Sequence, residues 1–95
     1  MRAFPRDLPK ESMPTLRYIL TIACPDRVGI VAAVSGVLAA HRGNIVESSQ
    51  FSDTESGRFF MRLVFDLDEA SEPVLLEHFT PLAQQFEMDW RLYDQ

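Results

Sequence analysis

The stretch CPDRVGI at residues 24–30 places a thiol, a carboxylate and a guanidinium within four positions. These groups would form a nucleophilic site if Cys24 were an exposed thiolate beside Arg27. The same residues fit a turn from a strand into a helix, because Pro25 lacks the N–H that continues a strand and Asp26 is a good N-cap. We favour the turn, with Cys24 as a structural thiol, since free cysteine is among the most often buried residue types.

Gly29 indicates a second kind of chemistry, the binding of an anion where a helix begins. Glycine in the first turn of a helix costs about 1 kcal/mol relative to alanine, so its presence there needs a reason. The backbone N–H groups of Val28, Gly29 and Ile30 could bind an anion at the positive end of the helix dipole. Alternatively, the missing Cβ only lets the helix pack closely on a sheet. Spacing alone leaves both explanations open.

The two histidines, His41 and His78, are the remaining candidates for a general base or a metal ligand. Neither has Cys, Asp or Glu at ligand spacing nearby, so we expect surface or hydrogen-bonded side chains. The chain contains no GxSxG, HExxH or phosphate-loop pattern. We therefore predict no catalytic residue, no metal and no cofactor in these 95 residues.

Apolar periodicity predicts six elements in the order βαββαβ. Alternating side chains predict strands at residues 16–24, 44–53, 58–67 and 87–94. An apolar stripe predicts a helix from Val28 to Arg42 that Gly43 closes. Ser71 should cap a second helix, which Pro81 should kink or end early because proline removes a helical hydrogen bond.

This order fits a ferredoxin-like sandwich, an α+β fold in which two helices cover one face of a four-stranded antiparallel sheet. The opposite face of strand 58–67 carries Phe60 and Arg62, which indicates a surface open to water or partly covered by another chain. Simple alternation in strand 44–53 places Ile45 and Gln50 on opposite faces. An RNA-recognition module shares the element order, but its third strand needs a glycine after a basic residue, so we disfavour RNA binding.

Composition limits the classes of function further. Ninety-five residues with 46% hydrophobic content suffice for one hydrophobic core. Fourteen acidic and nine basic residues give a net charge of -5, which argues against nucleic-acid and anionic-membrane surfaces. A single cysteine forms no internal disulfide, so we expect a cytoplasmic protein. We expect residues 1–15, with their three prolines, to be a flexible lead-in to a domain at 16–95.

The segment CPDRVGIVAAVSGVLAAHRGNIVESSQFSD, followed by GRFFMRLVF, resembles the amino-terminal ACT domain of the formyltetrahydrofolate deformylase family. The likeness runs from about Tyr18 to Trp90. Its first half, in which a strand, CPDRxGI, a helix and GNI follow one another, is shared with many amino-acid-binding ACT domains. The GRFFMR segment at 57–62 points more narrowly to the deformylase family.

The resemblance implies a regulatory module in front of a formyltransferase-like catalytic domain. The complete enzyme would hydrolyse 10-formyltetrahydrofolate to tetrahydrofolate and formate for purine synthesis. The catalytic residues of the family belong to that second domain, so this chain is a fragment of the deformylase or a stand-alone ACT protein. ACT domains pair side by side, which implies a homodimer or a tetramer.

The resemblance also implies a site for a small amino acid, with glycine and methionine as the suspected effectors. The family binds such ligands where the first strand–helix loop meets the second strand of a neighbouring copy. The residues that correspond in this chain are Asp26, Arg27, Val28, Gly29, Ile30, Asn44, Ile45 and Gln50. Helix N–H groups would take the ligand carboxylate, and the Asn44 amide would orient its ammonium group. The alternative is an assembly module without a ligand, in which Asn44 is a turn residue and Gln50 a solvated one.

Overall fold

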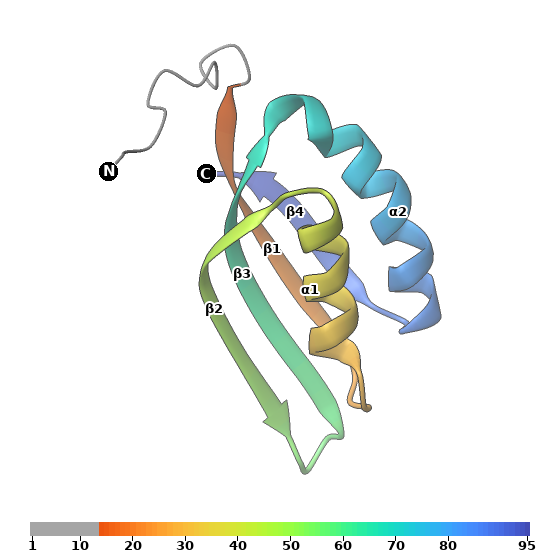
Figure 1. The fold of residues 1–95 in the computed structure, drawn as a ribbon. Coiled ribbons are helices and arrows are strands. Elements are labelled where there is room, and N and C mark those ends of the chain that lie inside the picture. Colours follow the sequence, from red (N-terminus) through yellow and green to blue (C-terminus); the bar gives the residue numbers. More distant parts are fainter. Residues whose placement is uncertain (1–13) are drawn as a thin grey trace, which may run out of the picture.

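The computed structural model describes residues 14–95, which form one sheet and two α-helices. The elements are β1 (Thr15–Pro25), α1 (Ile30–Ala40), β2 (Asn44–Asp53), β3 (Arg58–Asp68), a 3-10 turn η2 (Glu69–Ser71), α2 (Glu72–Gln85) and β4 (Asp89–Asp94). The antiparallel strands lie in the order β2-β3-β1-β4, and both helices cover the same face (Figure 1). The predicted ferredoxin-like βαββαβ sandwich is confirmed. β1 begins at Thr15, the last residue of the predicted lead-in, and residues 1–13 of that lead-in lie outside the described part.

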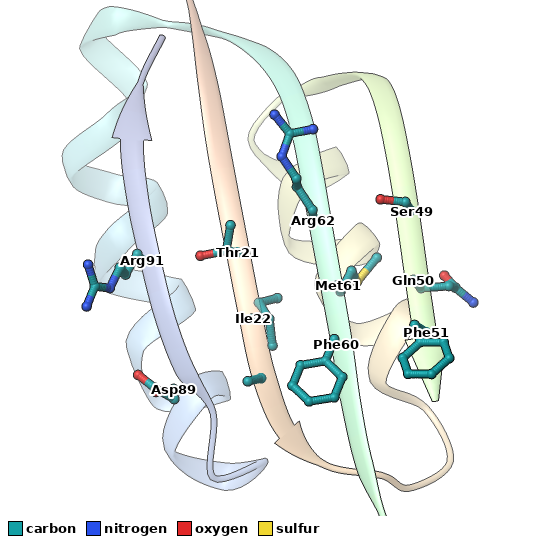
Figure 2. Close-up of a pocket in the computed structure, with 11 residues that line it drawn as sticks. Thr21, Ile22, Ser49, Gln50, Phe51, Phe60, Met61, Arg62, Asp89 and Arg91 are labelled. Atoms are coloured by element: carbon teal, nitrogen blue, oxygen red, sulfur yellow. The ribbon is translucent and has the colours of Figure 1, made fainter. Parts of the chain in front are cut away.

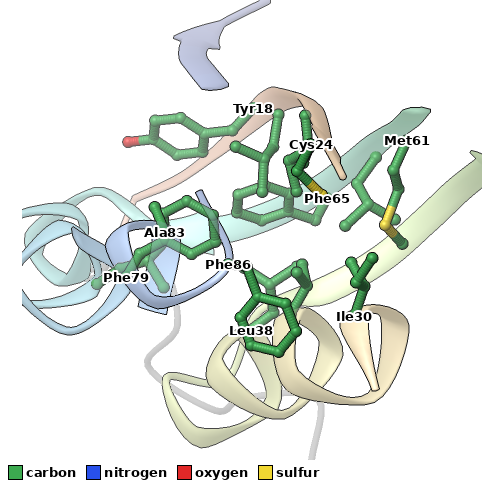
Figure 3. Close-up of a cluster of buried hydrophobic side chains, with 14 of the residues drawn as sticks. Tyr18, Cys24, Ile30, Leu38, Met61, Phe65, Phe79, Ala83 and Phe86 are labelled. Atoms are coloured by element: carbon green, nitrogen blue, oxygen red, sulfur yellow. The ribbon is translucent and has the colours of Figure 1, made fainter. Parts of the chain in front are cut away.

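The hydrophobic core lies between the helices and one face of the central strands β1 and β3 (Figure 3). Successive strand residues point to opposite faces, so every second side chain of these strands enters the core. The strand residues buried in this core are Tyr18, Leu20, Ile22, Cys24, Phe59, Met61, Leu63, Phe65 and Leu67. Side-chain alternation in the sequence predicts these same residues as the inner faces of the two strands, and the structure confirms this prediction. Each large apolar side chain buried in this way contributes about 1.5–3 kcal/mol to stability.

Helix α1 begins at Ile30 rather than at Val28, and the prediction that Asp26 caps it is wrong. Gly29 occupies the N-cap position with a φ of 96°, and no side chain in the described part of the chain caps the helix. Asp26 lies too far from the helix start because β1 continues through Pro25. Its backbone N–H instead donates to the Gly57 carbonyl at 2.9 Å. The loop is thus fixed to the β2–β3 turn.

At its other end α1 stops at Ala40 in a Schellman motif. The Gly43 N–H donates to the Leu38 carbonyl at 2.8 Å, and a Cβ on Gly43 would lie 3.2 Å from that oxygen. The predicted closure at Gly43 is confirmed. The left-handed residue, however, is Arg42, with a φ of 66°, and Asn44 is the first residue of β2.

Strand β2 contains a bulge that the alternation pattern did not reveal. Ile45 pairs with Phe65 and Glu47 pairs with Val64, so Val46 is the extra residue. From Glu47 onward each side chain of β2 therefore points to the face opposite to the one that simple alternation predicts. Ile45 and Gln50 therefore share the helix-facing side of the sheet, and the prediction that they lie on opposite faces is wrong.

Helix α2 continues through Pro81 to Gln85, so of the two predicted effects of this proline, a kink or an early end, the early end is wrong. Leu75, Phe79 and Ala83 bury one stripe of the helix, and this packing outweighs the one hydrogen bond that proline removes. Ser71 occupies the predicted N-cap position but makes no side-chain cap, because it has the helical conformation that continues from η2.

The pKa of Tyr18 generates a prediction about alkaline stability. Burial, and then the charge of the Glu72 carboxylate, raise this pKa from 10.0 to about 12. Because the folded state holds this proton more tightly than the unfolded state, proton binding by Tyr18 contributes to the free energy of unfolding. The contribution is complete below pH 10 and is lost as the pH rises toward 12. We expect the free energy of unfolding in urea to fall across this window, and to fall less in Tyr18→Phe. Equal falls in the two proteins would contradict this origin.

Candidate functional site

The β1–α1 loop, residues 26–29, is held in place by the neighbouring β2–β3 turn. In that turn Asp53 accepts hydrogen bonds from the Glu55 N–H at 3.2 Å and from the Ser56 hydroxyl at 2.9 Å. Gly57 closes the turn with a φ of 71°, and its carbonyl accepts the Asp26 N–H. The Asp26 side chain itself is exposed to solvent.

Arg27 packs against the end of α2 and not against Cys24. Its guanidinium lies 4.6 Å from the centroid of the Phe86 ring and donates a long hydrogen bond of 3.5 Å to the Gln85 carbonyl. The side chain is exposed, and within residues 14–95 it forms no ion pair with a carboxylate. Arg27 therefore links the loop to α2.

The start of α1 presents backbone N–H groups beside an exposed apolar residue. The first hydrogen bond of the helix runs from the Ala33 N–H to the Gly29 carbonyl at 2.9 Å, and no side chain of residues 14–95 caps the N–H groups that precede it. Val28 is 96% exposed, whereas Ile30 is buried in the core. This end of the helix can accept an anion without displacing a protein group.

The conformation of Gly29 separates the two explanations for this residue. A Cβ on Gly29 would meet no atom within 4 Å, so close packing on the sheet does not require glycine here. The φ of 96° does require it, because side chains rarely adopt that backbone region. Gly29 also lies just before the helix and not in its first turn.

The three residues of β2 that are expected at the amino-acid site lie at different ends of the strand within one chain. Gln50 pairs with Met61, toward the end where Pro25 and the loop lie. Asn44 pairs with Asp66 at the opposite end, about 30 Å along the strand from Asp53 at 3.4 Å per residue. Asn44 and Ile45 therefore do not meet the loop of their own chain.

Cys24 is a core residue and not a nucleophile. It is fully buried, and burial raises the pKa of its thiol, which disfavours the reactive thiolate. The prediction of a structural thiol is confirmed.

The two histidines lie together, which spacing in the sequence did not indicate. The Nε2 atom of His41 and the Nδ1 atom of His78 are 2.8 Å apart, so the two rings form a hydrogen bond with each other where α1 meets α2. Within residues 14–95 no three His, Cys, Asp or Glu side chains gather in an arrangement that could hold a metal ion.

A shallow recess of about 390 Å³ lies on the face of the sheet that the helices leave open (Figure 2). Thr21, Ala23, Phe60, Arg62 and Arg91 line it, together with residues of β2 and Asp89. The sequence placed Phe60 and Arg62 on this open face, but only strand order brings residues of four strands together.

Comparisons with known proteins agree on one family. A family model described as the ACT domain matches residues 18–82. A formyltetrahydrofolate deformylase of Corynebacterium sp. (strain P-1) is 40% identical over 82 residues, covering 84% of this chain and 29% of the relative. Crystal structures of formyltetrahydrofolate deformylases from Pseudomonas syringae and Burkholderia mallei are 50% and 39% identical, with TM-scores of 0.76 and 0.79. Each aligns with 83% of this chain and 28% of its own.

The chain thus spans less than a third of the length of these relatives. No helix within residues 14–95 is long and apolar enough to cross a membrane.

Gly29→Ala and Gly36→Ala form a matched pair that tests the backbone requirement of the loop. A Cβ at either position meets no atom within 4 Å, but only Gly29 has a positive φ. We expect Gly29→Ala to lower the free energy of unfolding by about 1 kcal/mol, because alanine is strained there. Gly36→Ala, within α1, should raise it by about 0.5–1 kcal/mol. Chemical denaturation measures both, and a neutral or stabilising Gly29→Ala would refute the role of φ.

Proposed function

This chain belongs to the ACT domain family, and we propose that it is the regulatory, amino-acid-binding ACT domain of a formyltetrahydrofolate deformylase. The support is an identity of 39–50% to two solved deformylases across 83% of the chain. In the complete enzyme a separate catalytic domain would hydrolyse 10-formyltetrahydrofolate to tetrahydrofolate and formate, in the cytoplasm, for purine synthesis. Consistent with a non-catalytic role, the described residues offer a buried thiol and two mutually bonded histidines.

The observation that carries the ligand proposal is the uncapped start of α1 after Gly29. A carboxylate placed there would accept hydrogen bonds from backbone N–H groups that have no acceptor among residues 14–95, and it would lie at the positive end of the helix dipole. Val28 of the loop and Ile30, the first residue of α1, are apolar, and no acidic residue occupies the first turn of the helix to repel the ligand. A small amino acid, with glycine or methionine as the suspected effector, fits this chemistry.

A second copy of the chain would complete the site. β2 lies at the edge of the sheet, and nine of its ten residues are exposed. If two β2 strands pair antiparallel about a twofold axis, Asn44 of the second copy lies near Asp53 of the first, at the loop end of the sheet. ACT domains generally oligomerise and bind small amino acids, which supports a homodimer or a tetramer of this kind.

The exposed edge also favours a second candidate function, an assembly module that binds no ligand. A strand of ten residues with an open edge is a ready template for pairing with another chain. Assembly alone, however, gives no reason for the uncapped helix start.

Calorimetric titration of the 95-residue chain with glycine, methionine and serine distinguishes the two functions. We expect saturable heat from one amino acid on a chain whose mass in solution is that of a dimer or tetramer. Gly29→Val should abolish this heat, because the side chain strains the loop and blocks approach to the N–H groups, whereas Gly36→Ala should preserve it. A chain that assembles but gives no heat with any of the three would support the assembly module.

The chain alone should not release formate from 10-formyltetrahydrofolate. A coupled formate assay would compare it with Cys24→Ala, which removes the only thiol. Equal background rates in the two proteins are expected. Formate release above that of the Cys24→Ala control would contradict a purely regulatory chain.

A further inference from the structure

The open face of the sheet carries two neighbouring rows of side chains with different chemistry. The strand register places Ser49, Arg62, Thr21 and Arg91 in one row across β2, β3, β1 and β4. The next row contains Phe51, Phe60, Ala23 and Asp89. Both rows line the recess of about 390 Å³, on the side of the sheet away from the helices (Figure 2).

The two arginines of the first row, Arg62 and Arg91, are less firmly paired with carboxylates than Arg17 is. Arg17, elsewhere on this face, is bound by Asp66 through two hydrogen bonds of 2.8 and 3.0 Å. Arg62, in contrast, forms one longer and exposed ion pair of 3.7 Å with Glu47, and Arg91 forms no ion pair with the rest of the described chain. Arg91 and the weakly paired Arg62 place two positive charges beside the recess, and Asp89 is the one acidic residue among those that line it, so the local charge favours an anion.

The aromatic residues of the second row form an exposed stacking surface. Phe51 is 63% exposed and Phe60 is 40% exposed, with ring centroids 6.3 Å apart and an angle of 21° between the rings. Ala23 follows Phe60 in the row, and its short side chain leaves the space that forms the recess. A flat ring placed against these side chains would bury apolar surface that water now contacts.

The geometry points to a binding site for a small ligand in which a flat ring is joined to a carboxylate. The ring stacks on Phe51 and Phe60, and the carboxylate accepts hydrogen bonds from Arg62, Arg91 and the Thr21 hydroxyl between them. In Figure 2 both guanidinium groups are directed away from Thr21, so binding requires them to turn inward. Such rotation of exposed side chains is fast. Gln50, one of the residues expected at the amino-acid site, also lines this recess, whereas residues 26–29 of the β1–α1 loop do not.

The site follows from the geometry, whereas the choice of one test ligand rests on the proposed function. Folates join a ring system to glutamate carboxylates, so 5-formyltetrahydrofolate is one probe. The second, p-aminobenzoylglutamate, is the part of a folate that has one flat ring and the carboxylates, which are the two groups that the recess is proposed to bind. Glutamate and inorganic phosphate, which have no ring, are the matched controls.

Amide chemical shifts of the labelled 95-residue chain, recorded during titration, locate any binding. We expect saturable shifts at Thr21, Phe51, Phe60, Arg62 and Arg91 with p-aminobenzoylglutamate, and weaker or no shifts with glutamate or phosphate. The double variant Arg62→Gln/Arg91→Gln should weaken binding by about tenfold or more, because it removes charge-assisted hydrogen bonds. Arg42→Gln, which removes a charge from the α1–β2 turn, should leave binding unchanged.

The aromatic surface is tested in the same way. Phe51→Ala should weaken binding, whereas Tyr93→Ala, on the same face outside the recess, should not.

Saturable binding of p-aminobenzoylglutamate without binding of the folate would support the site and exclude the folate as its ligand. No saturable shifts with either probe, shifts confined to residues 26–33, or a change of mass in solution on Phe51→Ala would overturn the proposal. An absence of heat in the calorimetric titration with amino acids would not change these chemical shifts, so the amino-acid site and the recess are tested independently of each other.

Discussion

The antiparallel pairing of β1 with β3 is the constraint on which the rest of the structure depends. The two strands pair from Thr15 opposite Asp68 to Pro25 opposite Arg58 without an irregularity. Because side chains alternate between faces, this one register decides which residues enter the core and which face outward. A slip of one residue would move the apolar set of β1 to the open face and expose it to water. The core under the helices therefore fixes the open face as well.

The same register positions both candidate sites. Pro25 opposite Arg58 brings the β1–α1 loop to the β2–β3 turn, where the hydrogen bond between Asp26 and Gly57 holds it. Thr21, opposite Arg62 on one side and Arg91 on the other, is the centre of the charged row on the open face. The two sites thus share a rigid frame while presenting different groups, backbone N–H groups in one and side chains in the other.

Assembly and ligand binding are coupled in the proposed function, because the amino-acid site combines the loop of one copy with Asn44 of another. A ligand that binds across such a contact stabilises the assembled form, and assembly raises the affinity for the ligand by the same factor. Regulation of a catalytic domain then follows if its active and inactive arrangements differ in how these ACT domains pair. The bulge at Val46 bends the β2 edge where this pairing would occur.

Local patterns in the sequence determined the element order, the inner faces of β1 and β3, the turn at CPDRVGI and the burial of Cys24. These features follow from side-chain alternation, helical periodicity and the chemistry of proline and glycine, which act between near neighbours. Only the tertiary structure decided the pairing of His41 with His78, the recess between Arg62 and Arg91, and the separation of Asn44 from the loop. Those features depend on strand order and register. The bulge in β2 also reverses the faces that its later residues occupy, so alternation alone assigned those residues to the wrong faces. Contacts between residues far apart in the chain are set by packing of the whole core, which no short segment encodes.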